Sequence, residues 1–437
     1  MPLRPTNAST DCPVIAETPD DASCFFGFHD VSPWNPADDC LVVLRAPEMQ
    51  AGLPGGDAVA EVCLWRPGPG TIEPIGATRA WNWQQGARAQ WLPGGNRLIY
   101  NAMTMDGNTG TVGAVLYDVD SGSEAALPGP IGALSPDGAT SIAPDYGRLA
   151  RYWPAYGYGG SRAPASIESQ APADDGLWQM DLASGARTLF VSVGDAVAVG
   201  SASPTNADHF LSHASFSPSG KRVAFLHRYF TRDGGFYTRM IVCNNDGAHL
   251  RILAEEKVSH FDWFGDESIA VWTRPGGGRL AAARRSGLLA NPLLKPLVNV
   301  ARKLKPGLKQ AMLREFYFMI PVDDPKARRP IGQGQLEQDG HPMFSKDRRW
   351  MLTDTYANSD GLQTLILFDM KAGARIDIGH FNHNPGSTDS DLKCDLHPRW
   401  NRAGTQVCID AARGGTRQCL IVDVTKVAGA AALDEAA

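Results

Sequence analysis

The sequence lacks the features that define several large classes of protein. Its first residues, MPLRPTNASTDCPV, contain no apolar stretch typical of a signal peptide, and no run of about 18 apolar residues occurs anywhere. Basic residues do not predominate, because 41 Lys and Arg face 47 Asp and Glu, for a formal net charge of −6. This balance argues against a protein that coats nucleic acid. We therefore expect a cytoplasmic protein with no nucleic-acid partner and no stable membrane insertion.

Cysteine pairs and nucleotide-binding motifs are also missing. The eight cysteines include no CxxC pair, so neither a zinc ribbon nor a redox motif is indicated, and most thiols are expected to be reduced and buried. There is no phosphate-binding loop, no GxSxG motif and no dinucleotide fingerprint after a predicted strand. Turn-forming residues are plentiful, with 46 Gly and 31 Pro, and 43% of the residues are hydrophobic. This composition predicts a folded, turn-rich protein with a sizeable core.

A loose repeat is the most informative feature of the chain. Each copy has a short stretch that ends in an anchoring aromatic residue or Leu, then a turn rich in Pro, Asp and Gly, then an alternating apolar strand. Such a copy predicts a β-hairpin, and a second hairpin signal follows several of them, which makes four strands per repeat. Four-stranded repeats are typical of β-propeller blades, so we predict an all-β, seven-bladed β-propeller. The seven copies span residues 31–44, 89–101, 133–143, 214–226, 261–272, 342–354 and 398–410.

The spacing of the anchoring residues indicates where the chain is longer than the blades require. Two of the intervals are 82 and 81 residues long, whereas a bare blade needs roughly 40–50. We therefore predict one insertion at about 145–173 and a basic, helical insertion at about 284–314, between blades 5 and 6. The second is expected to be a lid on the propeller, with a membrane-surface helix as the alternative. The predicted domain boundaries are an N-terminal segment 1–24, the propeller 25–428 and a flexible tail 429–437.

Four histidines occupy one position in consecutive repeats. The residue three before the anchor lies where the innermost strand of a blade begins, near the predicted central funnel. In the last four repeats this residue is a histidine, although the chain has only 10 in total. Imidazoles that converge at one depth suit a divalent metal such as Mn²⁺ or Zn²⁺, or a metal with a base. The alternative is that each histidine caps its strand by bonding to the neighbouring blade. The four are His213, His260, His341 and His397.

Further polar and aromatic residues are predicted on the same face, because the second strand of each blade returns to it. Arginine there suits a carboxylated ligand, glutamine a metal or sugar hydroxyls, and aromatic rings a sugar face. Each has a structural alternative, namely an ion pair between blades or packing in the core. Asp354 and Asp410 are equally suited to bonding backbone groups of the next blade, and we favour that structural role for Asp410. The other candidates are Arg88, His227, Arg228, Tyr356 and Arg399, His29 in FFGFHDVSPW, Trp81, Gln84 and Gln85 in WNWQQG, and Tyr156 and Tyr158 in the first insertion.

Three segments carry a resemblance to a known family. HASFSPSGKRVAFLHRYF, DGHPMFSKDRRWMLTDTYA and CDLHPRWNRAGTQVCID resemble the WD40-like (TolB-type) propeller repeats of the oligogalacturonate lyase family, best over the last four repeats. The resemblance implies a cytoplasmic enzyme in which three histidines and a glutamine hold Mn²⁺, another histidine acts as base and an arginine assists. On this pattern the expected catalytic residues are His213 as base, Arg228, Arg88 and Tyr356. The expected metal ligands are His260, His341, His397 and Gln85, and the other candidates above would bind substrate.

The implied reaction is β-elimination on a uronic-acid residue. A base removes the C5 proton, which is acidic only when a cation neutralises the adjacent carboxylate. We therefore expect a carbon–oxygen lyase that acts on an acidic, uronate-containing oligosaccharide, with Mn²⁺ as the expected ion. Two alternatives stay open: a non-catalytic propeller that binds saccharide or protein, and a glycoside hydrolase with paired carboxylates such as Asp30 and Asp354. The sequence predicts neither the sugar nor the oligomeric state.

Overall fold

The computed structural model describes residues 8–9, 11–46, 52–200, 206–231, 235–255, 257–274, 315–383 and 390–429. The predicted helical insertion at 284–314 lies outside the described residues, as does the predicted tail beyond Gly429. No helix in the described part of the chain is both long enough and apolar enough to cross a membrane. All eight cysteines are free thiols, and seven of them are buried.

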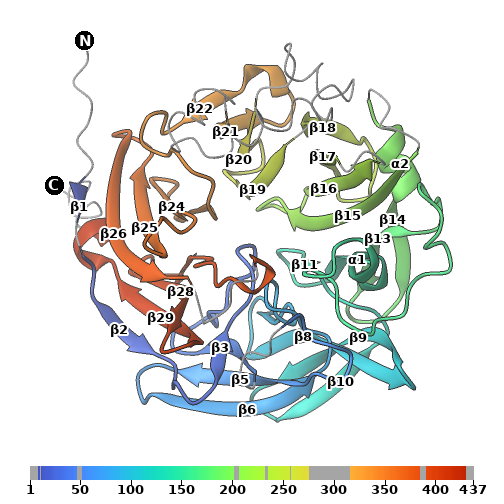
Figure 1. Ribbon diagram of the computed structural model, residues 1–437, viewed down its shortest axis with the longest axis horizontal. Coiled ribbons are helices and arrows are strands. Elements are labelled where there is room, and N and C mark those ends of the chain that lie inside the picture. Colours follow the sequence, from blue (N-terminus) through green and yellow to red (C-terminus); the bar gives the residue numbers. More distant parts are fainter. Residues whose placement is uncertain are drawn as a thin grey trace. The chain divides into compact units, whose positions relative to one another are not determined.

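The fold is a seven-bladed β-propeller, as predicted, and most of its strands are labelled in Figure 1. Six sheets have four strands, and a two-residue strand adds a fifth to the other. The first three sheets follow the chain: β3 to β6 (Ser23–Phe25, Leu41–Ala46, Ala60–Arg66, Thr71–Thr78), β7 to β10 (Gln90–Trp91, Arg97–Asp106, Thr109–Asp118, Ser123–Leu127) and β11 to β14 (Ala133–Leu134, Thr140–Pro144, Gly176–Asp181, Arg187–Ser192). The next two are β15 to β18 (Ala207–Phe216, Arg222–Thr231, Phe236–Asn244, Arg251–Ala254) and β19 to β22 (Val258–Trp263, Ser268–Thr273, Phe316–Pro321, Arg329–Ile331).

The last two sheets each include a strand from the beginning of the chain. β1 (Ala8–Ser9) runs parallel to β26, and β2 (Val14–Glu17) runs antiparallel to β29. The residues assigned from sequence to an N-terminal segment thus supply two strands. The sixth sheet is β23 to β26 (Met343–Phe344, Trp350–Asp354, Leu362–Asp369, Ala374–Asn382) with β1, and the seventh is β27 to β29 (Arg399–Trp400, Gln406–Arg413, Thr416–Asp423) with β2.

Helices are few and short. Two α-helices occur among the described residues, α1 (Tyr146–Tyr152) and α2 (Val193–Ala198). The Asp145 side chain caps α1 by accepting from the Arg148 N–H at 2.9 Å. Three further single turns are η2 (Pro325–Ala327), η3 (Ser390–Leu392) and η4 (Thr425–Gly429).

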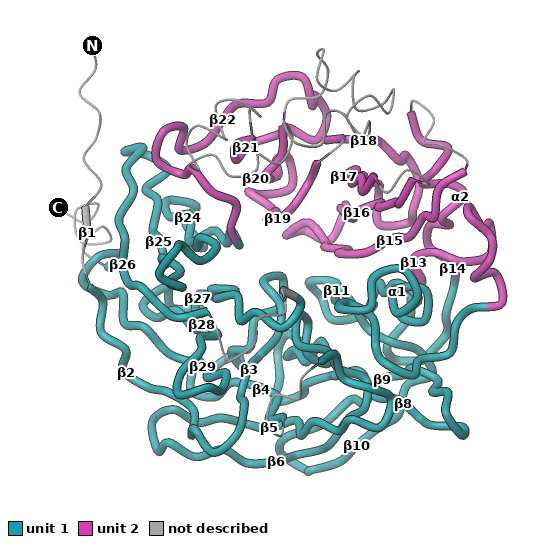
Figure 2. Tube along the Cα trace, viewed as in Figure 1, with its two compact units in different colours: residues 1–164, 179–188, 341–437 teal, residues 165–178, 189–340 magenta. Residues whose placement is uncertain are grey.

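The chain divides into two compact units, which Figure 2 colours separately. Unit 1 comprises residues 1–164, 179–188 and 341–437, and unit 2 comprises residues 165–178 and 189–340.

The repeated turn explains why each copy folds as a hairpin. In five copies, the main-chain N–H four residues after the anchor donates to the carbonyl of the residue directly after the anchor. Gly220 donates to Ser217 in this way at 2.8 Å. That fourth residue has a positive φ, which glycine adopts readily. The side-chain oxygen of the first residue then accepts the N–H of the sixth, as Ser217 does from Arg222 at 3.2 Å. The equivalent first residues are Asn35, Ser135, Ser217, Ser345 and Asn401.

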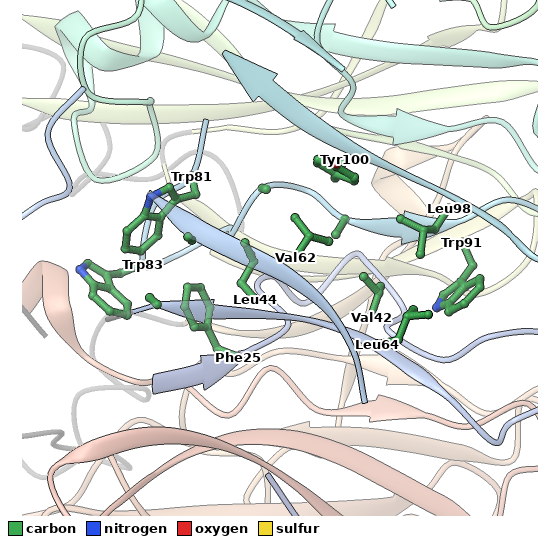
Figure 3. Packing of buried hydrophobic residues seen from close by; sticks show 14 of the residues in the cluster. Phe25, Val42, Leu44, Val62, Leu64, Trp81, Trp83, Trp91, Leu98 and Tyr100 are labelled. Atoms are coloured by element: carbon green, nitrogen blue, oxygen red, sulfur yellow. The ribbon is translucent and has the colours of Figure 1, made fainter. Parts of the chain in front are cut away.

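Strands β4 and β5 of the first blade are buried on both faces. Val42 and Leu44 of β4 belong to one hydrophobic cluster, drawn in Figure 3, whereas Val43 between them belongs to another. Because side chains alternate across a strand, a one-residue slip would exchange the two clusters completely. This explains why these strands are continuously apolar. Other members of the cluster in Figure 3 are Phe25, Val62, Leu64, Trp81, Trp83, Trp91, Leu98 and Tyr100.

The ends of β20 and β21 lie close together, and this predicts the effect of removing residues 275–314. β20 and β21 pair up to Thr273 and Phe316, and the next residues, Arg274 and Glu315, form a buried ion pair. Replacing residues 275–314 with a four-residue Gly-Ser linker should therefore preserve the fold. For a flexible chain, closing a four-residue connection costs about 2 kcal/mol less entropy than closing one of 40 residues, so the free energy of unfolding should rise by up to that amount. Urea unfolding checks this expectation, and an insoluble or unfolded variant would contradict it.

Candidate functional site

A buried carboxylate fixes the orientation of His341, which precedes β23. The Asp354 side chain, at the end of β24, accepts the main-chain N–H of His341 at 2.7 Å. Both Asp354 oxygens also lie 2.9 Å from Nδ1 of the His341 ring. The two side chains are 2% and 1% exposed. A carboxylate at Nδ1 places the imidazole proton there and leaves Nε2 as the nitrogen that can bind a metal.

His397 and Asp395 lie next to His341 in unit 1. The ring centroids of His341 and His397 are 4.5 Å apart, and the two ring planes are nearly perpendicular. One ligand atom from each of His341, Asp395 and His397 lies within 4.8 Å of the others. Two imidazoles and a carboxylate are suitable ligands for a divalent transition metal, and three protein ligands leave coordination positions for substrate oxygens. The donor set and the Asp354 contact behind His341 therefore fit a metal ion.

Asp395 was not among the residues selected from sequence. The available signal was the DLH spacing, because alternate residues of an extended segment point to the same side. Its carboxylate oxygen Oδ1 accepts a hydrogen bond from Nε2 of Gln363 at 3.3 Å. Gln363 is 1% exposed and lies on β25, so a buried amide orients this candidate ligand.

His29 also lies beside the two histidines. Its ring centroid is 5.4 Å from that of His341 and 6.3 Å from that of His397. The Asp410 carboxylate holds the preceding segment by accepting the N–H groups of Phe26 at 3.2 Å and Gly27 at 3.5 Å. Burial raises the pKa of Asp410 to about 7. Asp410 thus has the backbone-bonding role proposed for it from sequence.

Two tyrosines predicted from sequence are near these histidines, and a third is in the core. Tyr356 is 38% exposed, with its ring centroid 6.2 Å from that of His341. Tyr156 lies edge-on to Phe28 at 5.8 Å, and Phe28 lies edge-on to His397 at 5.3 Å. Tyr158, in contrast, is fully buried, and its hydroxyl accepts from the Asn101 amide at 2.8 Å. Tyr158 therefore has a packing role in this structure.

Arg88 is bound by Asp30 through a two-point ion pair. The Nη1–Oδ1 and Nη2–Oδ2 distances are 2.5 and 3.0 Å, and Nη2 also donates to the Gly132 carbonyl at 3.1 Å. Burial alone would lower the pKa of the Arg88 guanidinium, but the facing Asp30 carboxylate raises it overall. The two guanidinium nitrogens of Arg88 that would bind a substrate carboxylate are therefore already paired with Asp30.

The WNWQQG segment makes mainly internal contacts. Trp81 is 3% exposed, and its Nε1 donates to the Ala58 carbonyl at 3.1 Å, which corresponds to the core-packing alternative. The Gln84 amide donates to the Asp391 carbonyl at 3.1 Å. Gln85 is buried, and its N–H donates to the Asn82 side chain at 2.7 Å. The predicted metal-binding role of Gln85 stays a prediction.

Arg399 is buried on β27. Its Nη2 donates to the Pro342 carbonyl at 3.2 Å, next to His341 in the sequence. The side chain thus connects two segments of unit 1 that carry candidate ligands, and a direct contact with substrate stays a prediction.

Unit 2 contains the remaining candidates. His213 lies in a β-bulge of the β15–β16 pair with φ 55°, a strained conformation for a non-glycine residue. Nδ1 of His260 lies 3.1 Å from Oδ1 of Asp339. Burial would raise the pKa of Asp339, but His260 lowers it overall. The Arg228 guanidinium carbon lies 5.8 Å from the centre of the Phe236 ring.

His227 forms a buried imidazole pair with His209, a partner that sequence reasoning missed. Nε2 of His227 lies 2.8 Å from Nδ1 of His209, and both side chains are 0% exposed. The two residues are on adjacent strands of the same sheet. Burial, then the nearby charge of Arg239 and then His209 hold the pKa of His227 well below its ordinary value.

This shift predicts sensitivity of unit 2 to acid. The folded protein keeps His227 neutral, whereas the unfolded chain binds a proton at this residue below pH about 6.5. The free energy of unfolding therefore has its full value above that pH and decreases as the pH falls below it. A His227→Phe variant should lose less stability on acidification, by up to about 1.4 kcal/mol per pH unit. Urea unfolding at several pH values between 7.5 and 5 measures the difference. The exposed His380→Asn variant is the control, and equal slopes for wild type and His227→Phe would contradict the expectation.

Comparison with known proteins supports the fold. No protein-family model and no curated protein matches the sequence. Among solved structures, an oligogalacturonate lyase in complex with manganese matches with a TM-score of 0.60 and 14% identity, over 97% of this chain and 96% of that one. An oligogalacturonate lyase from Vibrio parahaemolyticus matches with a TM-score of 0.58 and 11% identity, over 98% of this chain and 100% of that one. The chain therefore has a propeller fold similar to that of the oligogalacturonate lyases over nearly its whole length.

The contact between Asp354 and His341 predicts a specific effect on metal affinity. Asp354→Asn removes the negative charge behind the imidazole and should weaken Mn²⁺ binding about 10- to 100-fold. Isothermal titration of the metal-free protein with Mn²⁺ measures this change. The exposed Asp360→Asn change in the following loop is the control and should leave the affinity unaltered. Unchanged affinity in Asp354→Asn would contradict the orienting role of Asp354.

Proposed function

We propose that the protein is a carbon–oxygen lyase that cleaves a uronate-containing oligosaccharide by metal-assisted β-elimination. The observation that carries the proposal is the convergence of His341, Asp395 and His397 in unit 1, with Asp354 behind His341. The fold gives further support, because a similar solved structure is an oligogalacturonate lyase in complex with manganese.

The ion in this proposal is divalent, and Mn²⁺ is our first choice. When bound, it would neutralise the uronate carboxylate and so make the neighbouring C5 proton more acidic. The residues proposed to hold it are His341, Asp395 and His397. Asp354 and Gln363 would orient two of them through hydrogen bonds to the ring and the carboxylate.

The chain's own residues would supply the remaining chemistry. An imidazole accepts the C5 proton, and the C–H electrons form the C4–C5 double bond. The glycosidic oxygen leaves C4 with the electrons of the broken C4–O bond and takes a proton from the solvent. We keep His213 as the proposed base, which its strained bulge position supports. For the carboxylate contact we propose Arg228 rather than Arg88, because Asp30 already binds both Nη atoms of Arg88.

Several residues of unit 1 are proposed to contact the substrate. Tyr356 is half-exposed beside His341, and His29 is adjacent to both His341 and His397. Tyr156 reaches the same cluster through Phe28. The geometry disfavours a hydrolase with Asp30 and Asp354 as the acid pair, because the first is bound to Arg88 and the second to His341.

A panel of uronate oligosaccharides tests the proposal. Turnover should produce the near-ultraviolet absorbance of a conjugated C4–C5 double bond, and a chelator should abolish it until Mn²⁺ is restored. His213→Ala should lower the rate at least about 100-fold, as expected for loss of a general base, whereas the exposed His380→Ala control should not. New reducing ends without absorbance would indicate a hydrolase. Saccharide binding without turnover would indicate a non-catalytic propeller.

A further inference from the structure

Arg417, on β29, is a buried cation that binds two segments distant from it in the sequence. The residue is 2% exposed. Its Nη1 donates to the Trp83 carbonyl at 2.7 Å, and its Nη2 donates to the Leu392 and Lys393 carbonyls at 2.9 and 2.7 Å. Two of the three carbonyls belong to the segment just before Asp395 and His397.

The surroundings of Arg417 indicate why the position requires an arginine. Its guanidinium carbon lies 4.9 Å from the Trp83 ring centroid and 5.6 Å from that of Phe25. Among the described residues no acidic side chain forms an ion pair with it, so carbonyl dipoles and ring faces, together with the nearby charge of Asp410, compensate its lost hydration. A planar guanidinium can lie flat on a ring while the N–H groups at its edge donate to carbonyls, whereas a lysine ammonium has no planar face to stack.

The segment that Arg417 holds is anchored at each of five consecutive residues. Arg417 binds the carbonyls of 392 and 393. At the other three residues, the Gln84 amide binds the Asp391 carbonyl, the Cys394 N–H donates to His383, and Gln363 binds the Asp395 side chain. Only Arg417 contributes more than one of these bonds. The carboxylate of Asp395 therefore faces His341 and His397 from a main chain whose course depends on a buried cation.

We propose that Arg417 is a positioning residue for the metal centre. It holds the main chain at 392–393 so that Asp395 can act as a ligand, and it does so without contacting the ion. The inference rests on the metal centre of the proposed function, and it assigns a role to a residue outside that centre.

A double-mutant cycle in Mn²⁺ affinity tests this role. Arg417→Met should weaken Mn²⁺ binding about 10-fold or more, the effect expected of an orienting contact. In an Asp395→Asn background, Arg417→Met should weaken Mn²⁺ binding less than about twofold, because Asp395, through which Arg417 acts on the ion, is already lost as a ligand. Arg417→Lys should fall between Met and wild type. Equal losses in both backgrounds, or none in the wild-type background, would overturn the proposal.

Arg239 provides a matched control, because it is another buried arginine whose guanidinium donates to main-chain carbonyls. Its Nη2 binds Ala196 and Val199, both at 2.9 Å, in unit 2. Arg239→Met should lower the melting temperature yet leave Mn²⁺ affinity within about twofold of wild type. A comparable loss of affinity in this control would show that any destabilised variant binds Mn²⁺ poorly, and would overturn the specific role of Arg417.

Hydrogen exchange on the metal-free protein gives an independent measurement. Arg417→Met should speed amide exchange in residues 391–397 and 81–86 and leave β15 to β17 unchanged, and Arg239→Met should not affect those two segments. Unaltered exchange in 391–397 would overturn the proposal even if the affinity changed. If the wild type bound no Mn²⁺, the proposed metal centre would be wrong, while exchange would still decide whether Arg417 holds this segment.

Discussion

Buried polar side chains on the second strands of the blades need hydrogen-bond partners, and this requirement organises the inner part of unit 1. Asn101, Asp354 and Asp410 occupy the same place in three repeats, 10 residues after the anchor. Each is at most 1% exposed, and each binds backbone groups: Asn101 at Ile131, Asp354 at His341 and Asp410 at Phe26 and Gly27. An unpartnered group there would cost about 1–3 kcal/mol. The same bonds therefore stabilise the fold and position His341 and His29.

Strained backbone conformations occur at a second repeat position, three residues before the anchor. Arg88 and His397 in unit 1 have φ values of 56° and 44°, and His213 in unit 2 has 55°. A left-handed conformation costs a non-glycine residue roughly 1–2 kcal/mol. Such strain persists where surrounding contacts over-determine the conformation, and it is concentrated at functional sites. For Arg88 the contact is the ion pair with Asp30. At these three of the seven repeat positions, a polar or charged side chain and a strained backbone occur at the same place.

Repetition decided how much could be predicted from sequence. The seven hairpins, their turns and the shared position of the histidines all follow from residues at fixed offsets, and the sheets confirm the seven blades. Asp395, Gln363 and Arg417 could not be found in this way, because they do not belong to the recurring pattern. The partners of Arg88 and His227 were also missed, since a buried ion pair 58 residues apart or an imidazole pair across two strands depends on the folded geometry. For Trp81 the core-packing alternative accounts for its burial.

The central claim is that His341, Asp395 and His397 bind one divalent ion. Anomalous diffraction from crystals grown with Mn²⁺, recorded on both sides of the manganese absorption edge, tests it most directly. We expect one strong anomalous peak about 2.0–2.3 Å from a nitrogen of each histidine and an oxygen of Asp395, and its loss in His397→Ala crystals. Fully occupied Mn²⁺ at another place, or no peak at a concentration that saturates binding in solution, would contradict it.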